Sequence, residues 1–154
     1  ASVELTEMAA WYASQGMTLY DALQALFEKY GYYGERTMNL VMPGLDGMRD
    51  MAAIMEQLHK APLTEVAGTA VVAQKDYQAG TVTDPATGAV TPMELKDSNV
   101  VAYDLADGTT FIIRPSGTEP KIKVYVLAHG GSQAECDEKL AKYTAFADVI
   151  KTMA

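Results

Sequence analysis

Residues 111–126 read FIIRPSGTEPKIKVYV, and the order of residue types in this stretch predicts two strands joined by a loop. Both ends are rich in β-branched and aromatic residues, which favour extended backbone. The middle, RPSGTEPK, holds two prolines, a glycine and two hydroxyl residues, all of which favour turns. A plain hairpin needs fewer special residues than this. The stretch therefore predicts two neighbouring antiparallel strands whose connection has a task besides reversing the chain.

The second of these strands leads into a long C-terminal helix. Ile122, Val124 and Val126 share one face of the strand, because side chains alternate along extended backbone. Ser132 and Glu135 then stand at capping-box spacing, which predicts the start of a helix. The apolar stripe of this helix consists of Cys136, Leu140, Tyr143, Ala147 and Ile150. Such a stripe needs an apolar partner, so we expect the helix to cover the sheet.

Further strands are expected upstream of residue 111. Residues 100–105 alternate between apolar and polar side chains, and Asp107-Gly108 is a strong signal for a tight turn into residues 109–113. Residues 66–75 are also rich in β-forming residues. The TVTDPATGAVT segment that follows them predicts a protruding hairpin or a long loop.

A strand and a helix are predicted before these strands. Residues 32–42 alternate between polar and apolar types until Pro43 and Gly44 break the pattern. A helix then ends near Lys60. Its apolar positions at helical spacing are Met48, Met51, Ala52, Met55 and Leu58. We interpret the methionines as core-filling residues, because that is their usual role at such spacing.

The chain begins with two predicted helices. Apolar residues recur at helical spacing over residues 3–15 and again over residues 18–30. Thr18 and Asp21 form a capping-box-like start for the second helix, and Gly31 stops it. These two helices should form an αα-hairpin that is too small to be a domain of its own.

The predicted fold class is α+β, with a four- to five-stranded antiparallel sheet and helices packed on one of its faces. The αα-hairpin precedes this unit. We therefore divide the chain into residues 1–31, which we interpret as the last helices of a preceding domain, and residues 32–154, which form the α+β domain. The chain starts without a methionine, inside the first predicted helix, so we interpret it as a fragment.

Composition excludes some classes of function. The 154 residues include 49% apolar residues, enough for a real core. The net charge of -8 repels phosphate polymers, so nucleic-acid binding, which only the sheet-and-helix class suggests, is opposed. No apolar run reaches the roughly 20 residues that span a bilayer. The single Cys136 can form no internal disulfide, which fits a reducing cytoplasm.

Positive charge collects around the loop between the two strands. Arg114, Lys121 and Lys123 stand against one carboxylate, Glu119, so residues 114–123 carry a net charge of +2. The rest of the chain is acidic, and the local field is therefore reversed. An anion is the expected ligand.

The loop also offers neutral hydrogen-bond donors. Ser116 and Thr118 supply hydroxyl groups, and Gly117 should let the backbone turn so that successive amides point at one anion. An arginine fork with hydroxyls and amides matches the tetrahedral oxygens of a phosphate monoester. The alternative is a structural turn whose hydroxyls cap their own backbone, which is the commoner use of a serine-glycine-threonine sequence.

The two histidines carry no metal-binding pattern. His59 and His129 are far apart and have no cysteine or carboxylate at metal-ligand spacing, so we interpret both as solvated or lightly packed side chains. Asp46-Gly47 lies at a helix start, where an acidic residue complements the helix dipole. We expect no metal site in this chain.

RPSGTEPK followed by IKVY resembles the C-terminal signature of the α-D-phosphohexomutases, and most closely the phosphoglucomutase and phosphomannomutase branch. The segment GMTLYDALQALFEKYGYYGE, residues 16–35, resembles the junction between the third and fourth domains of these enzymes. The resemblance covers essentially the whole chain. It implies that residues 32–154 form the fourth, TATA-binding-protein-like domain of an enzyme with four domains around one cleft.

The resemblance also implies a function. These enzymes interconvert hexose 1-phosphates and 6-phosphates through a bisphosphorylated intermediate, with a phosphoserine and Mg²⁺. The fourth domain binds the phosphate that is not reacting. Carried over by position, the phosphate ligands are Arg114, Ser116, Gly117 and Thr118, with Lys121 and Lys123 as supporting residues. The catalytic serine, the metal ligands and the sugar-recognition loop would lie upstream, so the isolated chain should be inactive.

The implied partners are a phosphosugar and the upstream domains of the same chain, with no nucleic acid and no membrane. Glucose and mannose phosphates both remain open as substrates, because sugar recognition in this family lies largely in the third domain. The alternative function is a freestanding anion-binding or regulatory module without catalysis.

Overall fold

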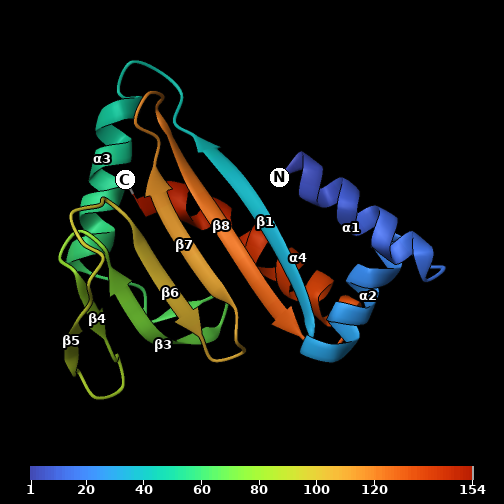
Figure 1. Ribbon diagram of the computed structural model, residues 1–154. Coiled ribbons are helices and arrows are strands. Elements are labelled where there is room, and N and C mark those ends of the chain that lie inside the picture. Colours follow the sequence, from blue (N-terminus) through green and yellow to red (C-terminus); the bar gives the residue numbers. More distant parts are fainter. Residues whose placement is uncertain (154) are drawn as a thin grey trace.

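The computed structural model describes residues 1–153, and Ala154, the last residue of the predicted second domain, lies outside this range. Figure 1 shows a twisted antiparallel sheet with helices on both sides of it. The helices are α1 (Ser2–Ser14), α2 (Leu19–Tyr30), α3 (Gly47–Lys60) and α4 (Gln133–Ile150), followed by a 3₁₀ turn (Lys151–Met153). The strands are β1 (Tyr32–Val41), β2 (Glu65–Val66), β3 (Thr69–Asp76), β4 (Thr81–Thr83), β5 (Val90–Pro92), β6 (Val101–Leu105), β7 (Thr110–Pro115) and β8 (Lys121–Gly130).

The α+β class and the antiparallel sheet are confirmed, but the sheet has more strands than predicted. Its order is β1-β8-β7-β6-β3-β4-β5, with β2 paired beside β3, so the described residues form eight strands instead of four or five. Ala67 and Gly68 have positive φ angles of 50° and 75°, and this tight turn splits the expected strand into β2 and β3. The hairpin after β3 also joins the sheet edge as β4 and β5 instead of standing apart.

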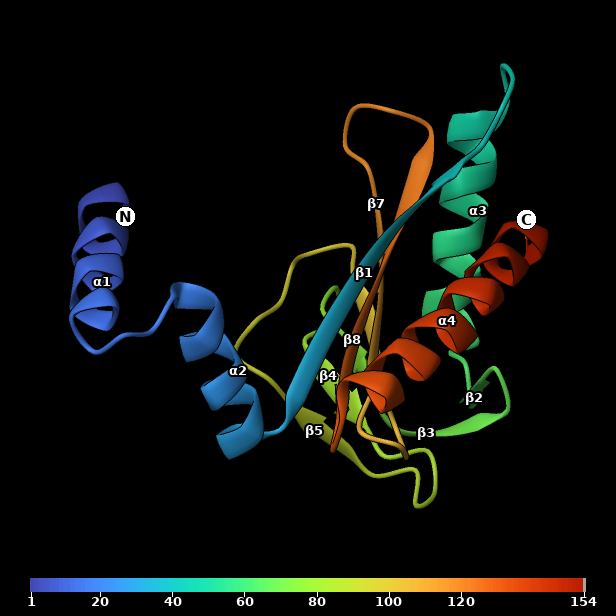
Figure 2. The same ribbon diagram turned by 90° about the vertical axis from the view of Figure 1, so that its right-hand side faces the viewer.

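Helices α3 and α4 pack on one face of the sheet, as predicted (Figures 1 and 2). The apolar side of β8, predicted from its alternation, is fully buried beneath them. All five residues of the predicted stripe of α4 are also buried. One part of the methionine prediction was wrong: Met51 and Met55 belong to the core, but Met48, in the first turn of α3, is 51% exposed.

A polar contact ties α4 to the turn between β6 and β7. The hydroxyl of Tyr143 donates to Asp107 Oδ2 at 2.6 Å and lies 2.8 Å from Thr69 Oγ1. Burial by itself would raise the pKa of Asp107, but hydrogen bonds from Tyr143 and from the backbone of Thr109 outweigh burial and lower it. Burial raises the pKa of Tyr143 to about 12. The contact therefore consists of a neutral phenol and a charged carboxylate.

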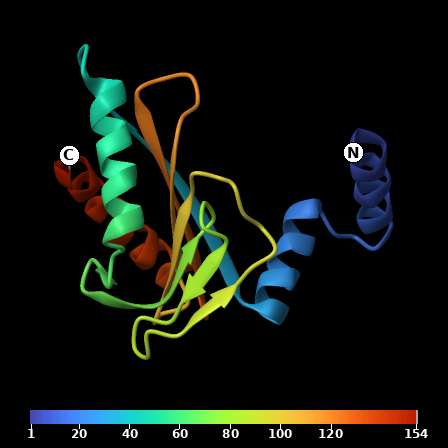
Figure 3. The same cartoon turned by 90° about the vertical axis from the view of Figure 1, so that its left-hand side faces the viewer.

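The two leading helices are present as predicted and lie on the other side of the sheet from α3 and α4 (Figures 2 and 3). Thr18 and Asp21 form the predicted capping box, with Asp21 N–H donating to Thr18 Oγ1 at 3.1 Å. Figure 1 shows α1 at a wide angle to α2, so the two helices do not pack side by side as the predicted αα-hairpin would. No residue of α1 is buried.

Gly31 connects α2 to β1 and has a conformation that favours glycine. Its φ of 94° and ψ of 166° lie in a region that other residues rarely adopt. A Cβ atom at Gly31 would also meet His129 Nε2 at 2.4 Å. His129, near the end of β8, packs beside Tyr33 with ring centroids 4.6 Å apart and ring planes tilted by 41°. The imidazole therefore packs against the junction between α2 and β1. This junction lies at the end of β8 opposite to the RPSGTEPK loop.

Candidate functional site

The RPSGTEPK loop lies between the end of β7 and the start of β8. At this end of the sheet it runs beside the segment that follows β1, at the top of Figure 1. The backbone N–H of Met42 donates to the Pro120 carbonyl at 2.8 Å and joins the two segments. A Cβ atom at Gly47 would lie 3.0 Å from Pro120 Cβ, so the start of α3 also packs closely against the loop. Both contacts involve Pro120 and fix that end of the loop.

Hydrogen bonds within the loop leave part of its backbone free. Ser116 N–H donates to the Lys121 carbonyl at 2.8 Å, and Lys121 N–H donates to the Glu119 carbonyl at 2.7 Å. Thr118 N–H reaches Ser116 Oγ only at 3.5 Å, which is a weak bond. Among residues 1–153 we find no acceptor for the N–H groups of Gly117 and Glu119. These exposed donors can bind an anion without breaking an internal bond.

Gly117 has a different role from the one expected. Its φ lies outside the positive range, so the turn does not require glycine. A Cβ atom built at this position would meet nothing within 4 Å. The structure around Gly117 therefore leaves its backbone open to close approach from outside the chain, which a side chain would obstruct.

Two cations stand opposite each other beside the loop. Arg114 of β7 pairs in register with Lys123 of β8. Their buried neighbours, Ile113 and Val124, face the helices, so Arg114 and Lys123 project from the other face of the sheet. Like charges directly opposite on neighbouring strands destabilise a sheet unless an anion lies between them. Within residues 1–153, neither cation has a carboxylate within 4.0 Å.

Lys121, unlike Arg114 and Lys123, has a carboxylate partner. Its Nζ lies 2.5 Å from Glu119 Oε2. The hydrogen bond from Lys121, together with the charges of Lys121 and Lys123, lowers the pKa of Glu119. The predicted residues are therefore brought to one end of the sheet, but Lys121 is already neutralised.

Asn39 lies beside these two cations and was not predicted from the sequence. It pairs in register with Lys123 from the other side, so Asn39, Lys123 and Arg114 form a line across three neighbouring strands. Adjacent strands lie about 4.8 Å apart, so the line spans about 10 Å. No local pattern could have identified Asn39, because its position depends on the pairing of β1 with a strand far along the chain.

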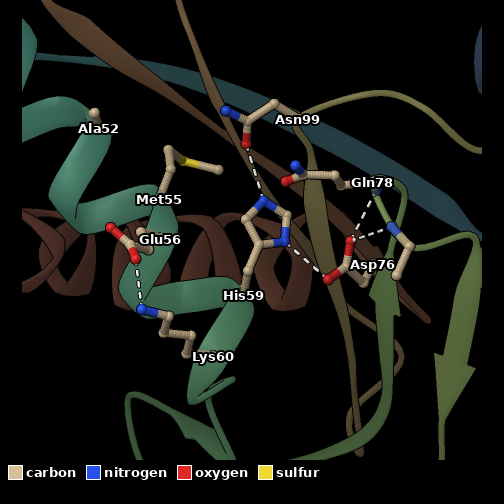
Figure 4. Close-up of a pocket in the computed structure, with 9 residues that line it drawn as sticks. Ala52, Met55, Glu56, His59, Lys60, Asp76, Gln78 and Asn99 are labelled. Atoms are coloured by element: carbon tan, nitrogen blue, oxygen red, sulfur yellow. Dashed lines mark hydrogen bonds and ion pairs between the residues drawn. The ribbon is translucent and has the colours of Figure 1, made fainter.

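His59 is not the solvated or lightly packed side chain that was predicted. Its Nδ1 lies 2.8 Å from Asp76 Oδ2, its Nε2 lies 2.9 Å from Asn99 Oδ1, and its side chain is 15% exposed (Figure 4). Burial alone would raise the pKa of Asp76, but hydrogen bonds from the backbone of Ala79 and from His59 outweigh burial and lower it. His59, Asp76 and Asn99 lie too far apart in the sequence for their spacing to predict this contact.

This histidine cluster does not form a metal site. Among residues 1–153, no group of three or more histidine, cysteine, aspartate and glutamate side chains is arranged to hold a metal ion. The same part of the chain contains no helix with the length and apolar character needed to cross a bilayer.

Comparison with known proteins identifies the family of this chain. The model of the phosphoglucomutase/phosphomannomutase C-terminal domain matches residues 52–145, which is more than half of the chain and includes the whole RPSGTEPK loop. The chain belongs to this family. The family assignment agrees with the sequence resemblance and with the antiparallel sheet that carries the loop.

Curated relatives of the family are phosphoglucomutases. The enzyme of Staphylococcus saprophyticus is 33% identical over 111 residues, which cover 71% of this chain and 20% of that protein. The enzyme of Staphylococcus aureus is 33% identical over 129 residues, which cover 81% of this chain and 23% of that protein. The chain therefore spans about a fifth of the length of these relatives. A solved structure of the Paramecium phosphoprotein parafusin, described as a phosphoglucomutase, covers 89% of this chain and 23% of its own, with 15% identity and a TM-score of 0.48.

Proposed function

We propose that this chain is the C-terminal part of a hexose phosphate mutase and that its RPSGTEPK loop binds the substrate phosphate that is not reacting. The observation that carries the proposal is the pair of Arg114 and Lys123, opposed in register with no carboxylate within 4.0 Å of either among residues 1–153. A phosphate dianion between them would replace repulsion with attraction.

The surrounding donors suit a phosphate group. A guanidinium fork can bind two oxygens of one phosphate, and the hydroxyls of Ser116 and Thr118 can donate to the third. The free N–H of Gly117 points to the same ligand class. Each hydrogen bond to a charged group contributes about 1.5–3 kcal/mol, so a few of them suffice for specific binding.

The loop would hold the substrate without making or breaking bonds. In a mutase that works through a bisphosphorylated intermediate, the two phosphates exchange roles, so one site has to bind whichever phosphate is idle. Such binding lowers the barrier by orienting the sugar at a distant reaction centre. Residues 1–153 contain no set of side chains that fits the Mg²⁺ of the full-length enzyme, and we assign no step to a metal here.

The helices α1 and α2 fit the proposal that residues 1–31 belong to a preceding domain and residues 32–154 form the phosphate-binding domain. Several large apolar side chains of these helices are exposed: Val3, Leu5, Met8, Trp11, Tyr20, Leu23, Leu26 and Tyr30. Apolar surface of this extent usually packs against another protein surface. In this proposal the other surface is the rest of the preceding domain of the same chain.

The proposal is tested by titrating the ¹⁵N-labelled chain with glucose 6-phosphate and, separately, with mannose 6-phosphate. We expect the amide signals of Ser116, Gly117 and Thr118 to move first. Both sugars should bind alike, because the loop is proposed to contact the phosphate and not the sugar. Arg114→Ala should weaken binding about tenfold or more, since it removes a charged bidentate contact.

Arg36→Ala is the matched control. Arg36 lies on β1 in register with the buried Val126, so it belongs to the face of the sheet opposite to Arg114. Its removal should leave binding unchanged. Equal effects of the two substitutions, or shifts confined to other regions, would overturn the assignment of the loop.

The second candidate is a freestanding anion-binding module without catalysis. It rests on the same loop and makes the same binding predictions. The encoding gene distinguishes the two, because a mutase requires upstream sequence for the catalytic serine, the metal ligands and the sugar-recognition loop. An initiator codon directly before Ala1 would favour the freestanding module.

A further inference from the structure

Glu119 is the only acidic residue of the RPSGTEPK loop, and it lies among the cations of the proposed phosphate site. Its Oε2 lies 2.5 Å from Lys121 Nζ. The hydrogen bond from Lys121 lowers the pKa of Glu119 most, and the more distant charge of Lys123 adds to this effect. The carboxylate therefore stands near both lysines and opposes the binding of a second anion there.

Lys121 is placed to reach an anion that the loop binds. Lys121 and Lys123 share a face of β8, because Ile122 between them is buried on the other face. Two residues along a strand are about 7 Å apart, and the flexible stem of a lysine can cover this distance. Ser116 N–H donates to the Lys121 carbonyl at 2.8 Å, so Lys121 also lies directly beside the loop.

The ion pair between Glu119 and Lys121 can open at low cost. The Glu119 side chain is 59% exposed and that of Lys121 is 21% exposed, and exposed ion pairs contribute little to stability. The backbone of Lys121 is held by the bond from Ser116 and by its own N–H, which donates to the Glu119 carbonyl at 2.7 Å. An exchange of partners therefore needs only rotation of side chains. A phosphate dianion attracts the ammonium group more strongly than a carboxylate does, because it carries more charge.

We propose that Lys121 exchanges Glu119 for the substrate phosphate, so that Glu119 competes with the substrate and limits how tightly the loop binds it. This proposal rests on the proposed function, which it deepens. Residues 114–123 carry a net charge of +2 with Glu119 and would carry +3 without it. In a mutase whose two phosphates exchange roles, each phosphate has to leave the loop before it can react. A carboxylate that takes Lys121 back favours this release.

Glu119→Gln tests the competition, because it keeps the size of the side chain and removes its charge. The ¹⁵N-labelled chain is titrated with inorganic phosphate, and the amide signals of Ser116 and Thr118 report binding. The variant should bind phosphate about two- to fivefold more tightly than the parent chain, which is the range expected for an exposed ion pair.

Glu35→Gln is the matched control, because it removes the same charge from the same face of the sheet. Glu35 pairs in register with Leu127, four residues along β8 from Lys123. This separation is about 13 Å, which exceeds the distance of about 8 Å beyond which physiological salt screens exposed charges. Phosphate binding should therefore be unchanged. A gain equal to that of Glu119→Gln would overturn the proposal, because net charge alone would then explain both.

Lys121→Gln, added to Glu119→Gln, tests whether Lys121 contacts the phosphate. The freed lysine is expected to bond the anion directly, so its removal should weaken binding about tenfold or more. Unchanged binding would show that Lys121 does not reach the phosphate and would overturn the exchange of partners.

In the full-length enzyme, Glu119→Gln should lower KM for the sugar phosphate and should not raise kcat. Tighter binding of the ground state and the transition state alike leaves the chemical step unchanged. A purely structural role of Glu119 predicts the opposite result, with weaker binding and a lower thermal midpoint.

The outcomes for this proposal and for the proposed function are distinguishable. Equal binding by Glu119→Gln and the parent chain overturns the competition, even where Arg114→Ala shows that the loop binds phosphate. Equal binding by Arg114→Ala and the parent chain overturns the assignment of Arg114, whereas a gain in Glu119→Gln still supports competition at the loop. Absence of phosphate binding by every variant overturns both.

Discussion

A substitution at Gly117 can separate the effect of this residue on the stability of the chain from its effect on anion binding. The backbone at this residue has no positive φ, and a Cβ atom would enter open space. Gly117→Ala should therefore raise the free energy of unfolding by about 0.4–1 kcal/mol, because the unfolded chain loses freedom and the folded chain gains no strain. Thermal unfolding measures this change.

The same substitution should weaken phosphate binding, since the added methyl group occupies the space through which a ligand reaches the free N–H. An amide titration with glucose 6-phosphate checks this half of the prediction. A variant that is stabilised and still binds as tightly as the parent chain would contradict the close-approach explanation for this glycine.

Asp107 should make the stability of the chain depend on pH. Its folded pKa is lowered below the unfolded value of 3.8, so its stabilising effect is fully present above that value. The effect is lost as the pH falls through the folded pKa. Asp107→Asn should lower the free energy of unfolding at neutral pH by about 1–3 kcal/mol, because the Tyr143 hydroxyl loses a charged acceptor.

Urea unfolding measured between neutral pH and about pH 2 checks this prediction. The difference between Asp107→Asn and the parent chain should shrink as the pH drops below 3.8. Asp137→Asn, on the exposed side of α4, is the matched control and should change stability little. A difference that stays constant across this range would show that the charge of Asp107 contributes nothing.

At the scale of elements, the junction between α2 and β1 depends on Gly31 and His129. Gly31→Ala should destabilise the chain by at least about 1–3 kcal/mol, because the backbone region is nearly closed to other residues. The clash with His129 Nε2 adds a steric cost. Adding His129→Ala to Gly31→Ala should recover the loss of stability that the clash causes. The loss that the backbone conformation causes should remain.

A double-mutant cycle in urea separates these two contributions. Both single variants, the double variant and the parent chain are compared by their unfolding midpoints. Coupling between the two positions is expected, with the double variant more stable than Gly31→Ala alone. Simple additivity would mean that the imidazole moves aside at no cost.

At the scale of the whole molecule, α1 is expected to contribute almost nothing to the stability of the sheet. None of its residues is buried, and several of its apolar side chains face solvent. Removal of residues 1–17 should therefore leave the thermal midpoint of the rest unchanged within experimental error, and should reduce self-association. Calorimetry and light scattering measure the two effects.

A large loss of stability on this truncation would contradict the division of the chain at residue 31. Removal of the C-terminal residues from 140 onward is the contrasting control, because it takes away every buried residue of the α4 stripe except Cys136. That variant should fail to fold. The two truncations together test which helices belong to the domain that carries the loop.

Much of the fold was accessible from sequence because its signals are local. The alternation along β8, the stripe of α4 and the capping box of Thr18 each depend on residues only a few positions apart, and the structure confirms all three. The strand count was wrong, because a positive φ at Ala67 and the docking of β4 and β5 follow from wider packing. The exposure of Met48 was missed for the same reason.

By itself, the sequence determined the α+β class, the family resemblance and the loop whose composition suits an anion. Only the tertiary structure decided which groups stand together: Arg114 opposite Lys123 with Asn39 beside them, and His59 hydrogen-bonded to Asp76. The physical reason is the distance along the chain over which each effect acts. Backbone preference and side-chain periodicity act between near neighbours in the chain, whereas strand register and helix docking depend on how distant segments bury their apolar faces together.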